Sequence, residues 1–336
     1  MNRNKLTRML ALLLAAAMLC LCAGCGQTKT DDPAPTNDPA PTNAPEAQTP
    51  VEPDQPTEPT GVTVTDMLGR EITLDAPAER VVALTASCCE ILYALDCGDT
   101  LVGRGTYCNY PAQVLEITEV ASGAETNVEQ IIALAPDVIL MADMAQSTEQ
   151  VEQLENAGVH VVVTDASNIA ETYESIRLIG QLMGKADKAE EIIGGMENTF
   201  NTLRDKVRAE HGDEKYSVYF EVSPLEWGLW AAGANTFMDE VAGLLGLENI
   251  FADVDGWGSV SEEQVLSRNP DYIVTISMYF GEGPTPTEEI LGRAGWENVS
   301  AVANSAILNL QNDELSRPGP RLAEGAQLLY DFVFGA

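Results

Sequence analysis

Short apolar runs alternate with amphipathic segments along the first half of the folded region. The runs are typical of buried strands, and the segments between them repeat with the helical period. The expected strands cover residues 62–64, 71–74, 80–84, 101–103, 137–141 and 160–164. The expected helices cover residues 88–95, 128–134 and 147–157. Strands that are separated by helices indicate parallel β-α-β units, and the first two strands indicate a hairpin.

The periodicity changes after residue 168, where about 40 residues of amphipathic helix are expected, with an interruption at Gly184. A second alternation follows this helical stretch. Its strands are expected at 216–222, 271–276 and 306–310, and its helices at 237–245, 262–268, 288–294 and 321–334. The pattern therefore predicts an α/β fold with two α/β lobes, each around a central sheet. The lobes are expected at 61–185 and 213–336, joined by one long α-helix over 186–212.

An internal repeat supports two lobes of similar construction. Residues 129–140 (EQIIALAPDVIL) and 263–274 (EQVLSRNPDYIV) share five of twelve positions. Each segment reads as a helix, a Pro-Asp turn and a strand, and each begins after a possible N-cap, Asn127 or Ser261. Both lobes are expected to use the same unit in equivalent places.

Glu129 and Glu263 fall in the first turn of these two helices. An exposed acid there interacts favourably with the helix dipole by about 0.3–1 kcal/mol, which is a sufficient structural reason for it. The paired placement, one glutamate in each lobe, also suits an acidic surface that meets a two-fold partner.

The N-terminus carries the signs of export. Arg3, Lys5 and Arg8 precede an apolar stretch over 9–21, which is too short to span a bilayer. The stretch ends in Cys22-Ala-Gly-Cys25, which resembles the lipobox of bacterial lipoproteins, although a leucine is usual where Cys22 stands. We expect residues 1–24 to be a removed signal peptide and Cys25 to be lipidated; a plain secretory signal is the alternative.

Residues 25–60 are predicted to be a disordered tether. Nine of the chain's 18 prolines lie in this segment, the sequence DPAPTN occurs twice in succession, and Val51 is its single large aliphatic residue. Such a segment buries too little apolar surface to offset the entropy of ordering. It is suited to holding a folded domain away from a membrane surface.

The charge balance excludes several classes of function. With 52 acidic and 18 basic side chains, the chain has a net charge of −34 and lacks the basic surface that nucleic-acid binding requires. Two histidines cannot supply a three-histidine zinc site, so no metal site is predicted. The chain contains no G-x-S-x-G motif and no glycine-rich phosphate loop, which disfavours an enzyme; a nucleophilic Cys88 or Cys89 is the alternative.

Aromatic residues gather in segments that are expected to be loops. A set of them suits a broad, flat and largely apolar ligand, although each one singly can cap a hydrophobic core. The candidates are Tyr107, Tyr110, Trp227, Trp230, Trp257 and Tyr279. The same loops carry six acids and three arginines, which disfavours strongly anionic ferric catecholates. Arg317 and Arg321 are further candidates, either for anionic groups such as haem propionates or for a structural role.

Four cysteines lie in the first lobe: Cys88, Cys89, Cys97 and Cys108. They are interpreted as small buried side chains. A Cys88–Cys108 or Cys89–Cys97 disulfide, or thiol contact with a ligand metal, stays open.

Residues 61–336 resemble the substrate-binding proteins of ABC importers for cobalamin, ferric siderophores and haem. The resemblance rests on residues 80–99, 106–111 and 316–321 and on the segments that contain Glu129 and Glu263. It implies two lobes linked by a single helix, with a ligand cleft between them. It further implies that Glu129 and Glu263 dock onto basic residues of an ABC permease dimer, which works with its ATPase.

The predicted function is therefore that of an exported, lipid-anchored, monomeric binding component of an ABC importer, without a cofactor of its own. The ligand is expected to be cobalamin or another corrinoid, because the segment that follows Trp257 resembles the cobalamin-binding branch. A ferric siderophore or haem is the alternative ligand. A surface protein for adhesion or sensing on the same fold is the alternative function.

Overall fold

The computed structural model describes residues 61–123, 126–142, 148–212, 214–279, 281–310 and 313–335. These residues belong to one compact unit, Pro56–Ala336. The expected signal peptide, the lipidation site Cys25 and the tether lie outside the described residues. Within these ranges, no helix is long and apolar enough to cross a membrane.

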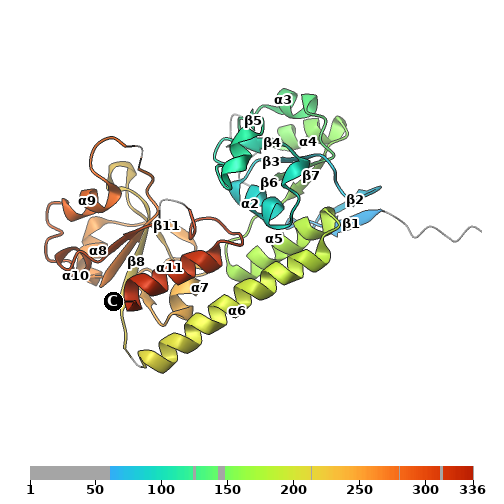
Figure 1. Ribbon diagram of the computed structural model, residues 1–336. Coiled ribbons are helices and arrows are strands. Elements are labelled where there is room, and N and C mark those ends of the chain that lie inside the picture. The colour runs from blue at the N-terminus through green and yellow to red at the C-terminus, as the bar shows by residue number, and fades with distance from the viewer. Residues whose placement is uncertain are drawn as a thin grey trace, which may run out of the picture. The chain divides into compact units, whose positions relative to one another are not determined.

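The first sheet consists of five parallel strands in the order β5-β4-β3-β6-β7 (Figure 1). The strands are β3 (Val81–Ala83), β4 (Leu101–Gly105), β5 (Glu119–Val120), β6 (Val138–Met141) and β7 (His160–Val163). The helices that alternate with them are α2 (Ala86–Ala94), α3 (Val128–Ala133) and α4 (Thr148–Asn156). Every residue of β3 and β6 is buried, as expected for interior parallel strands covered on both faces. A two-stranded hairpin, β1 (Val62–Thr65) and β2 (Glu71–Leu74), precedes this sheet.

The second sheet is mixed, with the order β11-β9-β8-β12-β13 and β10 also beside β8. Its strands are β8 (Ser217–Ser223), β9 (Trp230–Ala232), β10 (Glu248–Asn249), β11 (Trp257–Ser259), β12 (Tyr272–Thr275) and β13 (Ile307–Asn309). Its helices are α7 (Phe237–Leu244), α8 (Glu262–Arg268), α9 (Pro286–Leu291), α10 (Ser300–Ala303) and α11 (Leu322–Phe334). The predicted two-sheet α/β fold is confirmed.

One detail of the predicted topology was wrong. Trp230 and Trp257, which were expected in loops, begin β9 and β11, and these strands pair antiparallel at the sheet edge. Each strand has only three residues and the segments around them are rich in glycine, so neither produces a readable alternation.

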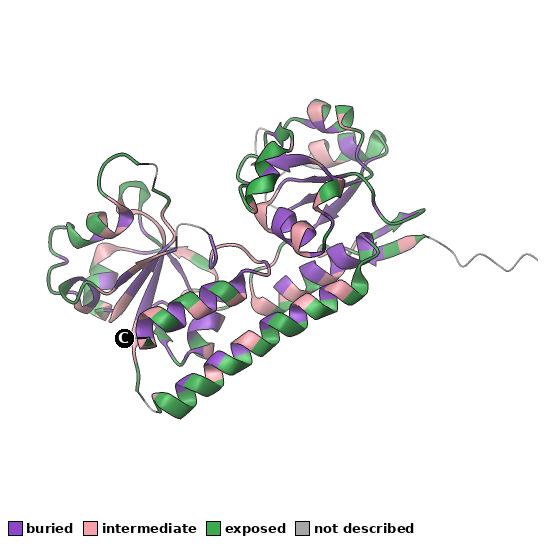
Figure 2. Cartoon of the chain, viewed as in Figure 1, coloured by how far each residue is buried: buried purple, intermediate pink, exposed green. Residues whose placement is uncertain are grey.

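Helices α5 (Ile169–Leu182) and α6 (Ala186–Glu210) connect the two sheets in the chain. Gly184 separates the two helices and has a φ of 65°, a conformation that glycine adopts without strain. The buried residues of α6 are Ala189, Ile193, Met196, Phe200, Leu203 and Val207. They recur every three or four positions and so form one apolar face, which packs against α5 and α11 (Figures 1 and 2).

The internal repeat is a repeated structural unit. Ala135 and Asn269, which are equivalent in the repeat, follow α3 and α8, and both have a φ of 46°. Asp137 and Asp271 follow these residues. In each, one carboxylate oxygen accepts hydrogen bonds from backbone N–H groups at the start of the neighbouring strand. In the first lobe the donors are Glu79 and Arg80, at 2.9 and 2.8 Å. In the second the donor is Ser217, at 2.9 Å. The Pro-Asp turns therefore fix where β6 and β12 begin beside β3 and β8.

The positive φ of Ala135 generates a stability prediction. A side chain with a Cβ is strained in this left-handed conformation, so Ala135→Gly should raise the free energy of unfolding by about 0.5–1 kcal/mol. Ala133→Gly is the matched control, because Ala133 is also exposed but has helical geometry, and it should lower stability by about 1 kcal/mol. Denaturant unfolding of both variants measures the difference. Two shifts of the same sign would contradict the prediction.

Candidate functional site

Several exposed hydrophobic residues, most of them aromatic, follow the carboxyl ends of strands. Tyr107 and Tyr110 follow β4, Trp227 follows β8, and Met278 and Tyr279 follow β12. Large hydrophobic side chains are exposed at all of these positions, and the Trp227 side chain is 75% exposed. In α/β sheets, ligands bind outside the carboxyl ends of the parallel strands. This end of the two sheets is therefore where a ligand site is expected.

A cavity of about 480 Å³ lies at this end. Its volume is within the usual range for small-molecule sites. The described residues that line it are Asn109, Tyr110, Met278, Tyr279, Glu314, Arg321 and Glu324. They come from the loop after β4, the loop after β12, and the segment from β13 into α11. Both sheets therefore contribute to the wall of one cavity.

A buried ion cluster holds these segments together. Glu90 of α2 has a side chain that is only 2% exposed. Its Oε1 accepts hydrogen bonds from Arg317 at 2.9 Å and from Arg321 at 2.7 Å, and its Oε2 accepts a second bond from Arg321 at 2.8 Å. The carboxylate thus joins α2 of the first lobe to the segment that precedes α11.

Arg317 extends the cluster to the loop after β4. Its guanidinium donates to Asn109 Oδ1 at 2.8 Å and to the Tyr107 carbonyl oxygen at 3.2 Å, and it lies 2.5 Å from an Asp313 carboxylate oxygen. The Arg321 guanidinium lies 4.0 Å from the centre of the Tyr110 ring. Arg317 therefore holds the loop after β4, and Arg321 lies against Tyr110, an aromatic residue of the cavity wall.

Arg321 keeps its charge in this setting. Burial by itself lowers the pKa of its guanidinium, but the hydrogen bonds and negative charge of Glu90 outweigh burial, and the pKa is raised. Arg321 lines the cavity, but its positive charge is already neutralised by the ion pair with Glu90.

Only some of the ligand-binding residues predicted from the sequence line the cavity. Tyr110, Tyr279 and Arg321 line it, whereas Tyr107, Trp227, Trp230, Trp257 and Arg317 are not among its lining residues. Trp230 pairs with Ser259, two residues from Trp257, so the two tryptophans share one face of the β9–β11 pair. The Trp257 ring also packs against Phe237, with ring centres 5.3 Å apart.

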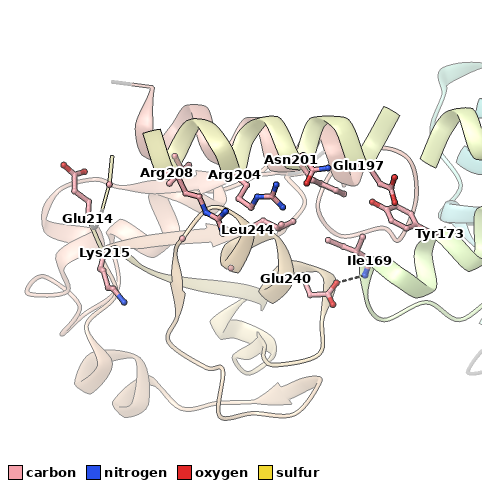
Figure 3. Close-up of a pocket in the computed structure, with 15 residues that line it drawn as sticks. Ile169, Tyr173, Glu197, Asn201, Arg204, Arg208, Glu214, Lys215, Glu240 and Leu244 are labelled. Atoms are coloured by element: carbon pink, nitrogen blue, oxygen red, sulfur yellow. Dashed lines mark hydrogen bonds between the residues drawn. The ribbon is translucent and has the colours of Figure 1, made fainter. Parts of the chain in front are cut away.

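A larger hollow of about 900 Å³ lies beside α6 and α7 (Figure 3). Glu197, Arg204 and Arg208 of α6 and Glu240 of α7 line it, and Glu240 accepts a hydrogen bond from the Ile169 backbone N–H at 2.7 Å. This hollow is bordered by helices, and none of the aromatic ligand candidates lines it.

The four cysteines Cys88, Cys89, Cys97 and Cys108 are buried free thiols. Burial raises the pKa of Cys88 to about 11, so this thiol stays protonated at neutral pH. Cys89 and Cys108 both donate to the Ala83 carbonyl oxygen, at 3.8 and 3.7 Å. The interpretation as small buried side chains fits these positions.

Glu129 and Glu263 occupy the same position in their two helices. Each is the second helical residue after a capped N-terminus, formed by Asn127 or Ser261, and each side chain is exposed. The pKa of Glu263 is held below its usual range because its carboxylate accepts hydrogen bonds from its own backbone N–H and from the Ser261 side chain.

Comparison with known proteins agrees with this architecture. Residues 81–314 match the family described as periplasmic binding protein. The chain belongs to the periplasmic binding protein family. As a periplasmic binding protein, it is the substrate-binding component of an ABC importer and not an enzyme.

Three relatives illustrate the range of the family. The uncharacterized ABC transporter substrate-binding lipoprotein YvrC of Bacillus subtilis is 32% identical over 327 residues, covering 96% of this chain and 95% of the relative. The vitamin B12-binding protein of Yersinia pestis is 31% identical over 260 residues, covering 77% and 88%. A solved Staphylococcus epidermidis protein, described as a possible iron-binding (periplasmic solute-binding) protein, is 32% identical with a TM-score of 0.64, covering 77% and 99%.

Sequence reasoning missed several residues of this periplasmic binding protein's cavity. Asn109, Met278 and Glu324 were not singled out, and Glu314 was counted only as one of several acids in the loops. Glu90 was missed entirely, although a single acid within the apolar run ASCCEILYA is a readable sign of a buried ion pair.

The ion cluster generates a stability prediction. Glu90→Gln removes the charge that neutralises Arg317 and Arg321, so the free energy of unfolding should fall by about 3 kcal/mol. Glu226→Gln, at an exposed acid in the loop after β8, should change it by less than about 0.5 kcal/mol. Urea unfolding compares the two variants. Equal stabilities would show that Glu90 does not hold the loops together.

Proposed function

We propose that this periplasmic binding protein carries a corrinoid to an ABC permease. The observation that carries the proposal is the cavity itself. It combines the exposed aromatic side chains of Tyr110 and Tyr279 with one arginine, Arg321, that is already neutralised by Glu90. Such a wall suits a broad ligand that has apolar faces and little net negative charge. The similarity to a vitamin B12-binding protein supports the same ligand class.

An iron chelate is the second candidate ligand. It is favoured by the Staphylococcus epidermidis relative, which is described as a possible iron-binding protein. A ferric siderophore of low net charge, such as a hydroxamate, suits the cavity better than a catecholate. The acids that line the wall, Glu314 and Glu324, would repel the strongly anionic catecholate complex.

The proposed location is the outer face of the cytoplasmic membrane, through a lipid on Cys25. The lipobox-like sequence that ends at Cys25 supports this anchor, and the similar Bacillus subtilis protein is described as a lipoprotein. Two acyl chains on Cys25 would give stable anchoring. The proline-rich residues 26–60 would then let the folded part reach its permease.

Glu129 and Glu263 are proposed to dock onto basic residues of the permease dimer. Their exposure and equivalent helix positions support this role, because a two-fold partner requires paired contacts on the two lobes. The lowered pKa of Glu263 keeps that carboxylate ionised in the pH range of growth.

The ligand is tested by titrating the mature protein with cyanocobalamin, dicyanocobinamide, haemin and ferrioxamine B. We expect a corrinoid to bind with a dissociation constant in the micromolar range or below. Binding should quench tryptophan fluorescence, because Trp227, Trp230 and Trp257 are exposed whereas Trp296 is buried. If the protein binds an iron chelate but no corrinoid, the proposed ligand is wrong and the importer role still stands.

The docking role is tested with the double variant Glu129→Ala/Glu263→Ala. Ligand affinity should stay within twofold of the unchanged protein, while uptake in cells and ligand-dependent ATPase stimulation of the reconstituted transporter should fall at least tenfold. The matched control is Glu149→Ala/Glu248→Ala, which removes one exposed acid from each lobe. Equal uptake by the two double variants would remove the docking role.

A further inference from the structure

Glu314 is a buried carboxylate in the wall of the cavity. Its side chain is 8% exposed. Its Oε1 lies 4.0 Å from Arg321, which is too far for a hydrogen bond. Its Oε2 is fully buried and has no hydrogen-bond partner among the described residues. A buried carboxylate oxygen without a hydrogen-bond partner is costly, and at a ligand cavity it is a candidate for contact with the ligand.

The neighbouring positive charges neutralise Glu314 only in part. The cluster contains three carboxylates, those of Glu90, Asp313 and Glu314, and two guanidinium groups, those of Arg317 and Arg321. Arg321 directs two of its nitrogens at Glu90, at 2.8 and 2.7 Å. Arg317 is shared between Glu90 and Asp313. One negative charge is therefore left over, and Glu314 is the carboxylate that holds it beside the cavity.

The chemistry of this group restricts the ligand. An ionised carboxylate only accepts hydrogen bonds, so the matching ligand group must donate them. Asn109 lines the same cavity, and its amide nitrogen is a donor. A carboxylate and an amide donor in one wall complement a primary carboxamide, which both donates and accepts. A ligand carboxylate in the same place would meet Glu314, and the exposed Glu324 of the same cavity, as like charges.

We propose that Glu314 recognises N–H donors on the rim of the ligand, and that the cavity thereby selects a corrinoid with carboxamide side chains over a chelate that carries carboxylates. The inference rests on the proposed corrinoid function and adds the residue that would accept hydrogen bonds from the peripheral groups of the ligand. Tyr110 and Tyr279 supply apolar contact in the same cavity, and Glu314 supplies selectivity between amide and acid.

The test uses two ligands with the same corrin ring. Dicyanocobinamide carries carboxamide side chains, whereas dicyanocobyrinic acid carries carboxylic acids in their place. At pH 7, the mature protein should bind the amide form at least 30-fold more tightly than the acid form. Glu314→Gln should reduce this ratio at least tenfold, through weaker binding of the amide form and stronger binding of the acid form.

Glu248→Gln is the matched control, because it removes the same charge from an exposed side chain that does not line the cavity. It should change the ratio less than threefold. Glu314→Asp is a second variant in case Glu314→Gln does not fold. It keeps the charge but withdraws the carboxylate, so it should weaken binding of the amide form and still reject the acid form. Thermal melting of each variant checks that it folds.

Each outcome decides between the claims. A protein that binds both corrinoids equally, or a ratio that Glu314→Gln leaves unchanged, overturns the role of Glu314 while corrinoid binding stands. A protein that binds neither corrinoid but binds haemin overturns both the selectivity and the corrinoid ligand. The amide-to-acid ratio of the unchanged protein is decisive even if no Glu314 variant can be purified.

Discussion

The apolar face of α6 is the constraint on which the rest of this structure depends. Six buried side chains at helical spacing run from Ala189 to Val207, and one continuous hydrophobic cluster includes them, residues of β3 and residues of β8. Burial of each large aliphatic or aromatic side chain contributes about 1.5–3 kcal/mol. One face of each sheet therefore belongs to a hydrophobic core that is continuous with this helix, whereas the other face of each sheet has a core of its own.

Ion pairs are the second important interaction, and they act locally around the cavity. The chain is strongly acidic, and most of the acidic side chains that the structure describes are exposed, where their charge favours solubility. At the cavity, individual acids have defined partners. Glu90 and Asp313 form ion pairs with Arg317 and Arg321 and so neutralise their positive charge. An arginine near a ligand site usually suggests an anionic ligand. Here both guanidinium groups are already paired, which leaves the cavity wall slightly negative.

The repeated unit explains why Glu129 and Glu263 occupy equivalent positions. The same helix, turn and strand occur in both lobes, with matching left-handed residues at Ala135 and Asn269 and matching aspartate contacts at Asp137 and Asp271. Since Glu129 and Glu263 belong to this unit, their equivalence follows from the way each lobe starts its inner strand. A partner with two-fold symmetry can contact such equivalent positions with the same surface on each of its subunits.

The sequence by itself determined the elements that local periodicity encodes. Residues 262–268 were predicted as a helix with the bounds that α8 has. The long helix, expected over 186–212, begins at Ala186 and ends at Glu210. The caps, the glycine break at Gly184 and the repeat were also readable, because each depends on neighbours within a few residues. Only the tertiary structure decided the edge strands that carry Trp230 and Trp257, because pairing across a sheet edge leaves little trace in three residues. It also decided the partners of Glu90, which lie 227 and 231 positions away, and it left Glu314 Oε2 without a hydrogen-bond partner among the described residues. Hydrogen bonds and burial between distant segments depend on where the whole fold places them, and no local pattern records that.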